Sequence, residues 1–273
     1  MFTESFMVRA LAAALMLAPL SALLGVFVTA RRMAFFSDTI AHGALAGIAL
    51  GMWLGMTDMT LPMVLFSLAI AAIILWLKEK TNLLTDTIMA LLLSGSVAFG
   101  IVILSLQQGS RGEIHAYLFG DILAVDTQDI WLAAALLIIV AFALFRFLSP
   151  MALITANEEM AHVCGIRVRR FNYLFVLVLT LTVAVTIRLL GIILVTSLLV
   201  IPAATGRNLS RNLRQQIISS ILVGLLGGFS GVLISYRLDV PCGPAIVLAC
   251  IALFILSLAV DRFFLNRKQE VTA

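Results

Sequence analysis

Long uncharged apolar runs recur along the whole chain, and they constrain the fold more than any other feature of the sequence. An α-helix needs about 20 predominantly apolar residues to cross a bilayer. The sequence therefore predicts an all-α integral membrane protein with eight or nine transmembrane helices. Splitting it at charged residues and at Pro- or Gly-bearing breaks gives runs near residues 8–30, 39–56, 60–77, 87–106, 130–148, 171–188, 190–205, 217–236 and 244–261.

The number of helices depends on residues 171–205. This stretch fits either two short helices that turn at residues 188–191, or one helix followed by a broken, partly re-entrant piece. A second segment, residues 107–129, is too polar to span, but its apolar part at 116–123 predicts an interfacial or re-entrant helix.

The composition excludes a water-soluble protein. Apolar residues make up 62% of the chain and charged residues 12%, whereas soluble domains are roughly half apolar and a quarter charged. No charged stretch is long enough for a second globular unit, so residues 1–273 are expected to form a single transmembrane domain. The formal charge of +4 resides in short clusters between apolar runs. Such clusters orient a membrane protein, and they do not indicate nucleic-acid binding.

The basic residues also predict the orientation. With nine helices, 14 of the 18 Lys and Arg residues fall on one side, and only Arg9, Arg111, Arg188 and Arg237 fall on the other. Positively charged loops face the cytoplasm, so we expect the carboxyl terminus there. Residues 148–170 then form the longest cytoplasmic segment and the expected docking surface for a soluble partner. The outer side gathers acidic residues, whose field would concentrate cations at the entrance.

Asp38 and His42 are the strongest candidate binding residues. Their four-residue spacing places them one turn apart on the same face of the second predicted helix. Ionisable side chains in an apolar span are costly unless they face a cavity, a partner or a cation. A carboxylate with an imidazole suits zinc, manganese or ferrous iron better than magnesium or calcium. The alternative is an Asp that caps the helix start and a His bonded to a neighbouring carbonyl.

The same helix carries glycines at a strict four-residue spacing, at Gly43, Gly47, Gly51 and Gly55. A ridge without side chains lets another helix approach closely. We expect this packing to hold the face of Asp38 and His42 rigidly, as a binding site requires.

Two motifs are absent from the sequence, and their absence favours transport over catalysis. There is no GxxxxGK[ST] loop to hold ATP phosphates, so an ATP-driven role needs another subunit. There is no HExxH motif of a zinc protease. A membrane-embedded metalloenzyme would need three protein ligands and an acid or base in one cavity, and the sequence offers only two ligands clearly. We expect no catalytic residues.

Four stretches together resemble the permease subunits of the bacterial zinc/manganese/iron ABC importer family, and the resemblance extends from about Leu24 to Leu258. Its zinc branch is the most similar. The stretches are residues 31–42, 117–125, 196–205 and 239–244.

This resemblance implies a multi-pass protein of the bacterial inner membrane with the ABC importer permease architecture. It implies a homodimer, two cytoplasmic ABC ATPase subunits that bind the ATP, and an extracytoplasmic metal-binding protein that delivers the ion. Zn²⁺, or alternatively Mn²⁺ or Fe²⁺, would be the cargo, and no cofactor would be bound permanently.

The resemblance also implies roles for particular residues. Asp38 and His42 match the family's intramembrane metal-coordinating positions. Asp121 is a weaker candidate ligand, which favours zinc because manganese-type members tend to carry Asn there. Asp239 is a candidate gate or entrance carboxylate.

Residues 157–165 are similar to the loop that importer permeases insert into the ATPase. Glu158, Glu159 and Ala161 would lie on its short helix, and Gly165 would permit a left-handed helix stop.

A different class of function stays open at this point. A self-contained secondary transporter could use Asp38 and Asp121 as proton carriers and would need no ATPase.

Overall fold

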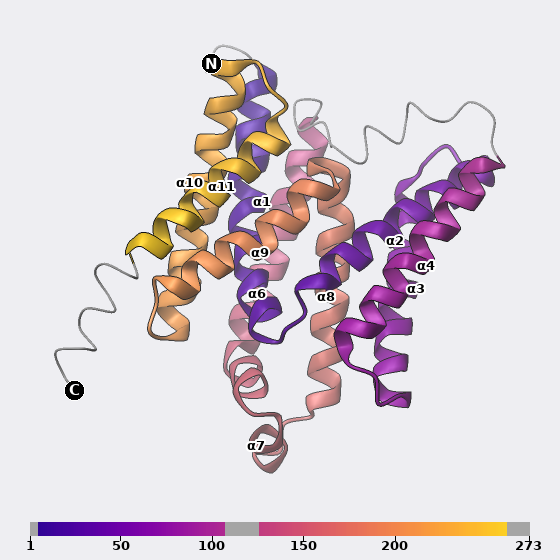
Figure 1. Cartoon of the computed structure of the whole chain (residues 1–273), viewed down its shortest axis with the longest axis vertical. Coiled ribbons are helices and arrows are strands. Elements are labelled where there is room, and N and C mark those ends of the chain that lie inside the picture. The colour runs from indigo at the N-terminus through magenta and orange to yellow at the C-terminus, as the bar shows by residue number, and fades with distance from the viewer. Residues whose placement is uncertain (1–4, 107–125, 261–273) are drawn as a thin grey trace. The chain divides into compact units, whose positions relative to one another are not determined.

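The computed structural model describes residues 5–106 and 126–260, and helices joined by short loops make up that part of the chain (Figure 1). The helices are α1 (Ser5–Ala30), α2 (Ala34–Trp53), α3 (Thr60–Lys80), α4 (Thr85–Ser105), α6 (Thr127–Ala156), α7 (Glu158–Val163), α8 (Val168–Leu190), α9 (Ile192–Asn208), α10 (Leu213–Leu238) and α11 (Cys242–Val260).

Eight of these helices are long and apolar enough to cross a membrane, which confirms the prediction of an all-helical membrane protein. The ninth apolar helix, α9, has only 17 residues. It is separated from α8 by Gly191, whose positive φ of 79° a residue with a side chain rarely adopts. The predicted turn at residues 188–191 therefore lies where the sequence placed it, and it divides two helices.

Helix α2 begins five residues before the predicted boundary at residue 39. The polar side chains near its start are satisfied within the helix, because Ser37 Oγ donates to the Ala34 carbonyl and Thr39 Oγ1 to the Phe35 carbonyl. Hydroxyl groups that bond back to the preceding turn do not end a helix. The predicted interfacial helix at 116–123 lies outside the described residues.

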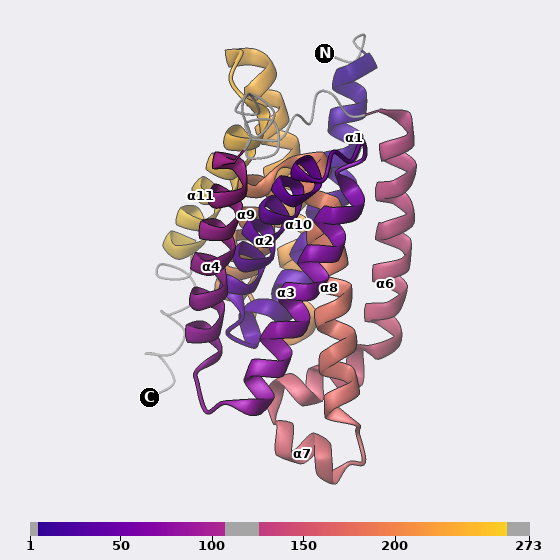
Figure 2. The ribbon, with the colours of Figure 1, turned by 90° about the vertical axis from the view of Figure 1, so that its right-hand side faces the viewer.

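The chain divides into two compact units. One contains α2, α3, α4, α7, α8 and the carboxyl-terminal part of α6. In it α3 runs beside α2, α4 and α8 (Figure 2). The other contains α1, α9, α10, α11 and the start of α6, and in it α10 packs on α11 at Gly231, where a Cβ atom would collide with Ile246. That residues 1–273 form a single transmembrane domain stays a prediction.

The two ends of α3 carry different polar contacts. At its start, Arg188 Nη1 donates to Thr60 Oγ1 at 2.9 Å, and the Thr60 backbone N–H donates to Asp58 Oδ1, which lowers the pKa of that carboxyl group. At its end, Glu79 accepts from Arg169. Arg188 and Arg169 thus lie at opposite ends of α3, as the predicted orientation requires.

Candidate functional site

Asp38 and His42 lie on a partly accessible face of α2. Both are half-buried, whereas Ser37, Thr39 and Ala41 beside them are buried. Because α2 begins at Ala34, Asp38 lies in the second turn of the helix, where the backbone N–H groups are already paired. The interpretation of Asp38 as a helix cap is therefore wrong.

The orientation of the His42 ring is fixed by the backbone of the same helix. Its Nδ1 atom lies 2.9 Å from the carbonyl oxygen of Asp38. A carbonyl oxygen can only accept a hydrogen bond, so this contact requires the proton on Nδ1. In the neutral ring the lone pair then resides on Nε2, and a ring fixed in this way is the arrangement that metal-binding histidines commonly have. The contact with a carbonyl and a role as metal ligand are therefore compatible.

His42 also lines a cavity of about 300 Å³ between α2 and α4. The other lining residues are apolar side chains of these two helices together with Gly100 and Ser96, and the Ser96 hydroxyl donates to the Leu93 carbonyl. An apolar wall of this kind lowers the local dielectric constant, which strengthens electrostatic interactions of a cation with any charged ligand nearby.

Three glycines of α2 lie against α3. A Cβ atom at Gly47 would lie 2.7 Å from both Phe66 Cβ and the Pro62 carbonyl oxygen, and one at Gly43 would lie 3.1 Å from Ile70 Cγ1. Gly51 meets the Pro62 ring in the same way. The contact of α2 with α3 therefore depends on the absence of side chains at these positions.

Gly55 does not belong to this ridge, contrary to the expectation from its spacing. Helix α2 ends at Trp53, and Gly55 adopts a φ of 68° with no atom within 4 Å of a Cβ position. Its N–H donates to the Met52 carbonyl, and the N–H of Met56 donates to the Gly51 carbonyl. These two bonds form a Schellman motif, so Gly55 ends the helix.

Two further site residues were predicted from the sequence, Asp121 as a weaker ligand and Asp239 as a gate or entrance carboxylate. Asp121 lies outside the described residues. Asp239 belongs to the other compact unit, where it is exposed and left-handed (φ 53°) after the end of α10. Among the residues that the structure describes, no group of three or more His, Cys, Asp or Glu side chains could hold a metal ion.

The short helix α7 is exposed on one side and packs against its neighbouring helices on the other. Asn157 caps its start, because its Oδ1 accepts from the Met160 N–H at 2.9 Å. Glu158 and Glu159 occupy the first turn, where the helix dipole favours negative charge. Both are exposed, and so is Val163, at 87%.

Ala161 attaches α7 to its neighbours. It is fully buried, and it forms a small core with Ile154 of α6 and Val168 of α8. After the helix Gly165 adopts a φ of 75°, and the Ile166 N–H donates to the Ala161 carbonyl. This is again a Schellman ending.

Arg31, which precedes α2, joins the two helices that flank α7. Its Nε donates to Thr155 Oγ1 of α6 and its Nη1 to Asn172 Oδ1 of α8, both at 3.0 Å. The guanidinium also lies 4.7 Å from the centroid of the Phe175 ring. Burial lowers the pKa of Arg31, and the charge of Glu158 opposes that shift.

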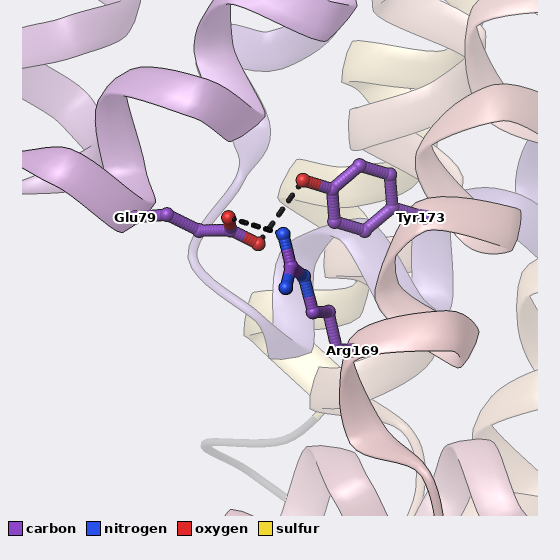
Figure 3. A network of polar contacts seen from close by, with 3 residues as sticks. All are labelled: Glu79, Arg169 and Tyr173. Atoms are coloured by element: carbon purple, nitrogen blue, oxygen red, sulfur yellow. Dashed lines mark hydrogen bonds and ion pairs between the residues drawn. The ribbon is translucent and has the colours of Figure 1, made fainter.

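A second polar cluster joins α3 to α8 (Figure 3). The Glu79 carboxylate accepts from Arg169 Nη2 at 2.8 Å and from the Tyr173 hydroxyl at 3.0 Å. No site role was predicted from the sequence for these residues or for Arg31. No local pattern could have revealed the contacts of Arg31, because its partners lie 124 and 141 residues further along the chain.

Comparisons with known proteins identify the family of this chain. The model of the family described as ABC 3 transport family matches residues 3–261. The chain is 33% identical over 249 residues to the high-affinity zinc uptake system membrane protein ZnuB of Haemophilus influenzae, covering 91% of this chain and 95% of that protein. It is 29% identical to the manganese import system permease protein ScaB of Streptococcus parasanguinis, covering 97% of this chain and 92% of that protein.

A solved structure gives the same fold. A chain of PsaBC from Streptococcus pneumoniae in complex with Fab superimposes with a TM-score of 0.83 at 27% identity, covering 97% of this chain and 96% of that chain.

Proposed function

The chain belongs to the ABC 3 transport family, and from that premise we propose that it is the permease of an importer that moves Zn²⁺ into the cytoplasm. It is a multi-pass membrane subunit and is not itself the ATPase. ATP hydrolysis then takes place on separate cytoplasmic subunits, and an extracytoplasmic binding protein delivers the ion.

The observation that carries the proposal is the face of Asp38 and His42 on α2. It offers a carboxylate and an imidazole whose tautomer presents Nε2, and zinc accepts both ligand types. The zinc assignment is supported by the similarity to ZnuB, which is named for zinc uptake. It is also supported by Asp121, because manganese-type members of the family that the sequence resembles tend to carry Asn at this position. The manganese alternative is supported by the similarity to ScaB.

Two ligands are fewer than the four that zinc normally takes. We propose that this permease acts as a homodimer, and that Asp121, water or the second copy completes the coordination during transport. Asp239 would act earlier, as a carboxylate at the entrance or gate. Glu158, Glu159 and Ala161 on α7, followed by Gly165, would form the loop that contacts the ATPase.

Uptake by cells tests the metal site. Cells that carry Asp38→Ala or His42→Ala are expected to lose zinc uptake, measured with radioactive zinc, while the variant protein reaches wild-type levels in the membrane. Asp86→Ala is the matched control, because Asp86 is an exposed carboxylate in the first turn of α4, and it should leave uptake unchanged. Normal uptake by both site variants would refute the assignment.

Competition identifies the ion. Excess unlabelled zinc should suppress uptake more than excess manganese or ferrous iron, and a preference for manganese would overturn the zinc assignment. Ion flux through the chain alone in liposomes, driven by a proton gradient, would favour a secondary transporter instead.

A further inference from the structure

We propose that Arg31 is a positioning residue that transmits the displacement of α7 to α2, the helix of Asp38 and His42. The inference rests on the proposed function, in which an ATPase moves α7. The displacement would pass through the side chain of Arg31, which precedes α2.

The first step is the attachment of α7 to its neighbours. Ala161 is buried between Ile154 near the end of α6 and Val168 at the start of α8. The chain links on either side of α7 are short, because Asn157 alone separates it from α6 and residues 164–167 separate it from α8. A protein that pushes on α7 must therefore also move the adjoining ends of α6 and α8.

The second step is the contact of Arg31 with both of these ends. Thr155 is the penultimate residue of α6, and Asn172 lies in the second turn of α8. The guanidinium donates to both of them at 3.0 Å and is held over the Phe175 ring of α8. A planar guanidinium can hold two acceptors in a fixed geometry, whereas an ammonium group is a single point with flexible donors. The contact is therefore stiff.

The third step is the stiffness of α2 itself. The helix begins at Ala34, three residues after Arg31, and runs without a break past Asp38 and His42. Near its start it is joined to α4 by the buried hydrogen bond from Thr39 Oγ1 to the Met89 carbonyl. Further along it lies close against α3 at Gly47. A displacement applied at Arg31 therefore moves the metal-site face as part of a rigid helix, as in transitions between packed states.

The neighbouring cluster of Glu79, Arg169 and Tyr173 provides a contrast. It also reaches the start of α8 (Figure 3), but its hydrogen bonds join α8 to the end of α3 and not to α2. The Arg169 side chain is 74% exposed, and exposed ion pairs contribute little. We expect Glu79→Gln to change transport much less than the variants of Arg31.

The test measures how many zinc ions move for each ATP hydrolysed. The permease is reconstituted in liposomes with its ATPase and binding protein, and zinc uptake and phosphate release are recorded in the same sample. Arg31→Met is expected to lower this ratio by about fivefold or more, the scale of a typical coupling between sites. ATP hydrolysis and assembly should persist. The matched control is Arg32→Met in the same loop, because Arg32 is exposed, and its ratio should equal that of the wild type.

Milder variants keep the proposal falsifiable if Arg31→Met does not assemble. Asn172→Leu and Thr155→Val each remove one acceptor and should lower the ratio in the same direction. Adding Asn172→Leu to Arg31→Met should cause no further loss, because both changes break the same contact. An unchanged ratio in all three single variants, or a loss of uptake and hydrolysis in equal proportion, would overturn the role of Arg31.

The two proposals fail separately. If the wild-type complex moves no zinc, the proposed function is wrong. If it moves zinc and the variants keep the wild-type ratio, only the role of Arg31 is wrong.

Discussion

At the scale of single residues, the end of α7 depends on the backbone of Gly165. Its φ is 75°, and nothing lies within 4 Å of a Cβ position, so a substitution meets no steric barrier from neighbours. The cost of a side chain is then the left-handed conformation itself, about 1–2 kcal/mol for an ordinary residue.

We expect Gly165→Val to weaken the binding of the ATPase subunit by roughly tenfold, because about 1.4 kcal/mol corresponds to a factor of ten. Affinity can be measured by titrating the purified ATPase onto the permease in nanodiscs. Gly165→Asn is the matched control, since Asn tolerates the left-handed region better than other side chains, and it should bind almost normally. Equal binding of the Val variant and the wild type would show that the ending of α7 does not govern docking.

At the scale of elements, the close contact of α2 with α3 holds the candidate site in place. A methyl group at Gly47 would collide with the Pro62 carbonyl, which belongs to the backbone and cannot move aside alone. Gly95, in α4, is also helical, but no atom lies within 4 Å of its Cβ position.

The same substitution should therefore have opposite effects on the free energy of unfolding at these two glycines. Gly47→Ala should lower the free energy of unfolding by about 1–3 kcal/mol, the usual cost of overpacking. Gly95→Ala should raise it by about 0.5–1 kcal/mol, because alanine favours the helix. Unfolding of the detergent-solubilised protein, followed by size-exclusion chromatography after heating, compares them. The prediction fails if the two variants are shifted in the same direction.

At the scale of the whole molecule, the orientation in the membrane decides which partner reaches α7. Cys164 caps the end of α7 and is exposed, whereas Cys242 and Cys250 are buried. One native thiol thus reports on the side of the membrane that α7 faces.

A membrane-impermeant maleimide should label Cys164 in inside-out vesicles and leave it unlabelled in intact spheroplasts. Bound ATPase should protect it, because the partner covers α7. Cys164→Ser should abolish the labelling and is the control for reaction elsewhere. Labelling from the outside would reverse the predicted orientation and with it the docking role of residues 157–165.

Several features were predictable from the sequence because they depend on local spacing. Eight of the helices in the described part of the chain are long enough to cross the membrane by themselves, so they could be identified without knowledge of their partners. The break at Gly191 was predictable because Arg188 and a glycine interrupt the apolar run there. Boundaries were less accurate where polar residues lie inside a helix, and the early start of α2 moved Asp38 from a helix start into the second turn.

Gly55 shows why spacing alone is not sufficient. Its position continues the four-residue series of Gly43, Gly47 and Gly51, yet the helix ends before it. The series could not reveal which glycine faces α3 and which ends α2, because a glycine serves both purposes equally well.

The sequence by itself determined that this protein is a helical membrane protein and that Asp38 and His42 share one face of a helix. Both conclusions follow from hydropathy and from helical periodicity, which are local properties of the chain. Only the tertiary structure decided that Gly47 of α2 lies against α3, and that Arg31 joins α6 and α8 on either side of α7. These features depend on atoms placed in three dimensions, and the partners of Arg31 are brought together only when the helices pack.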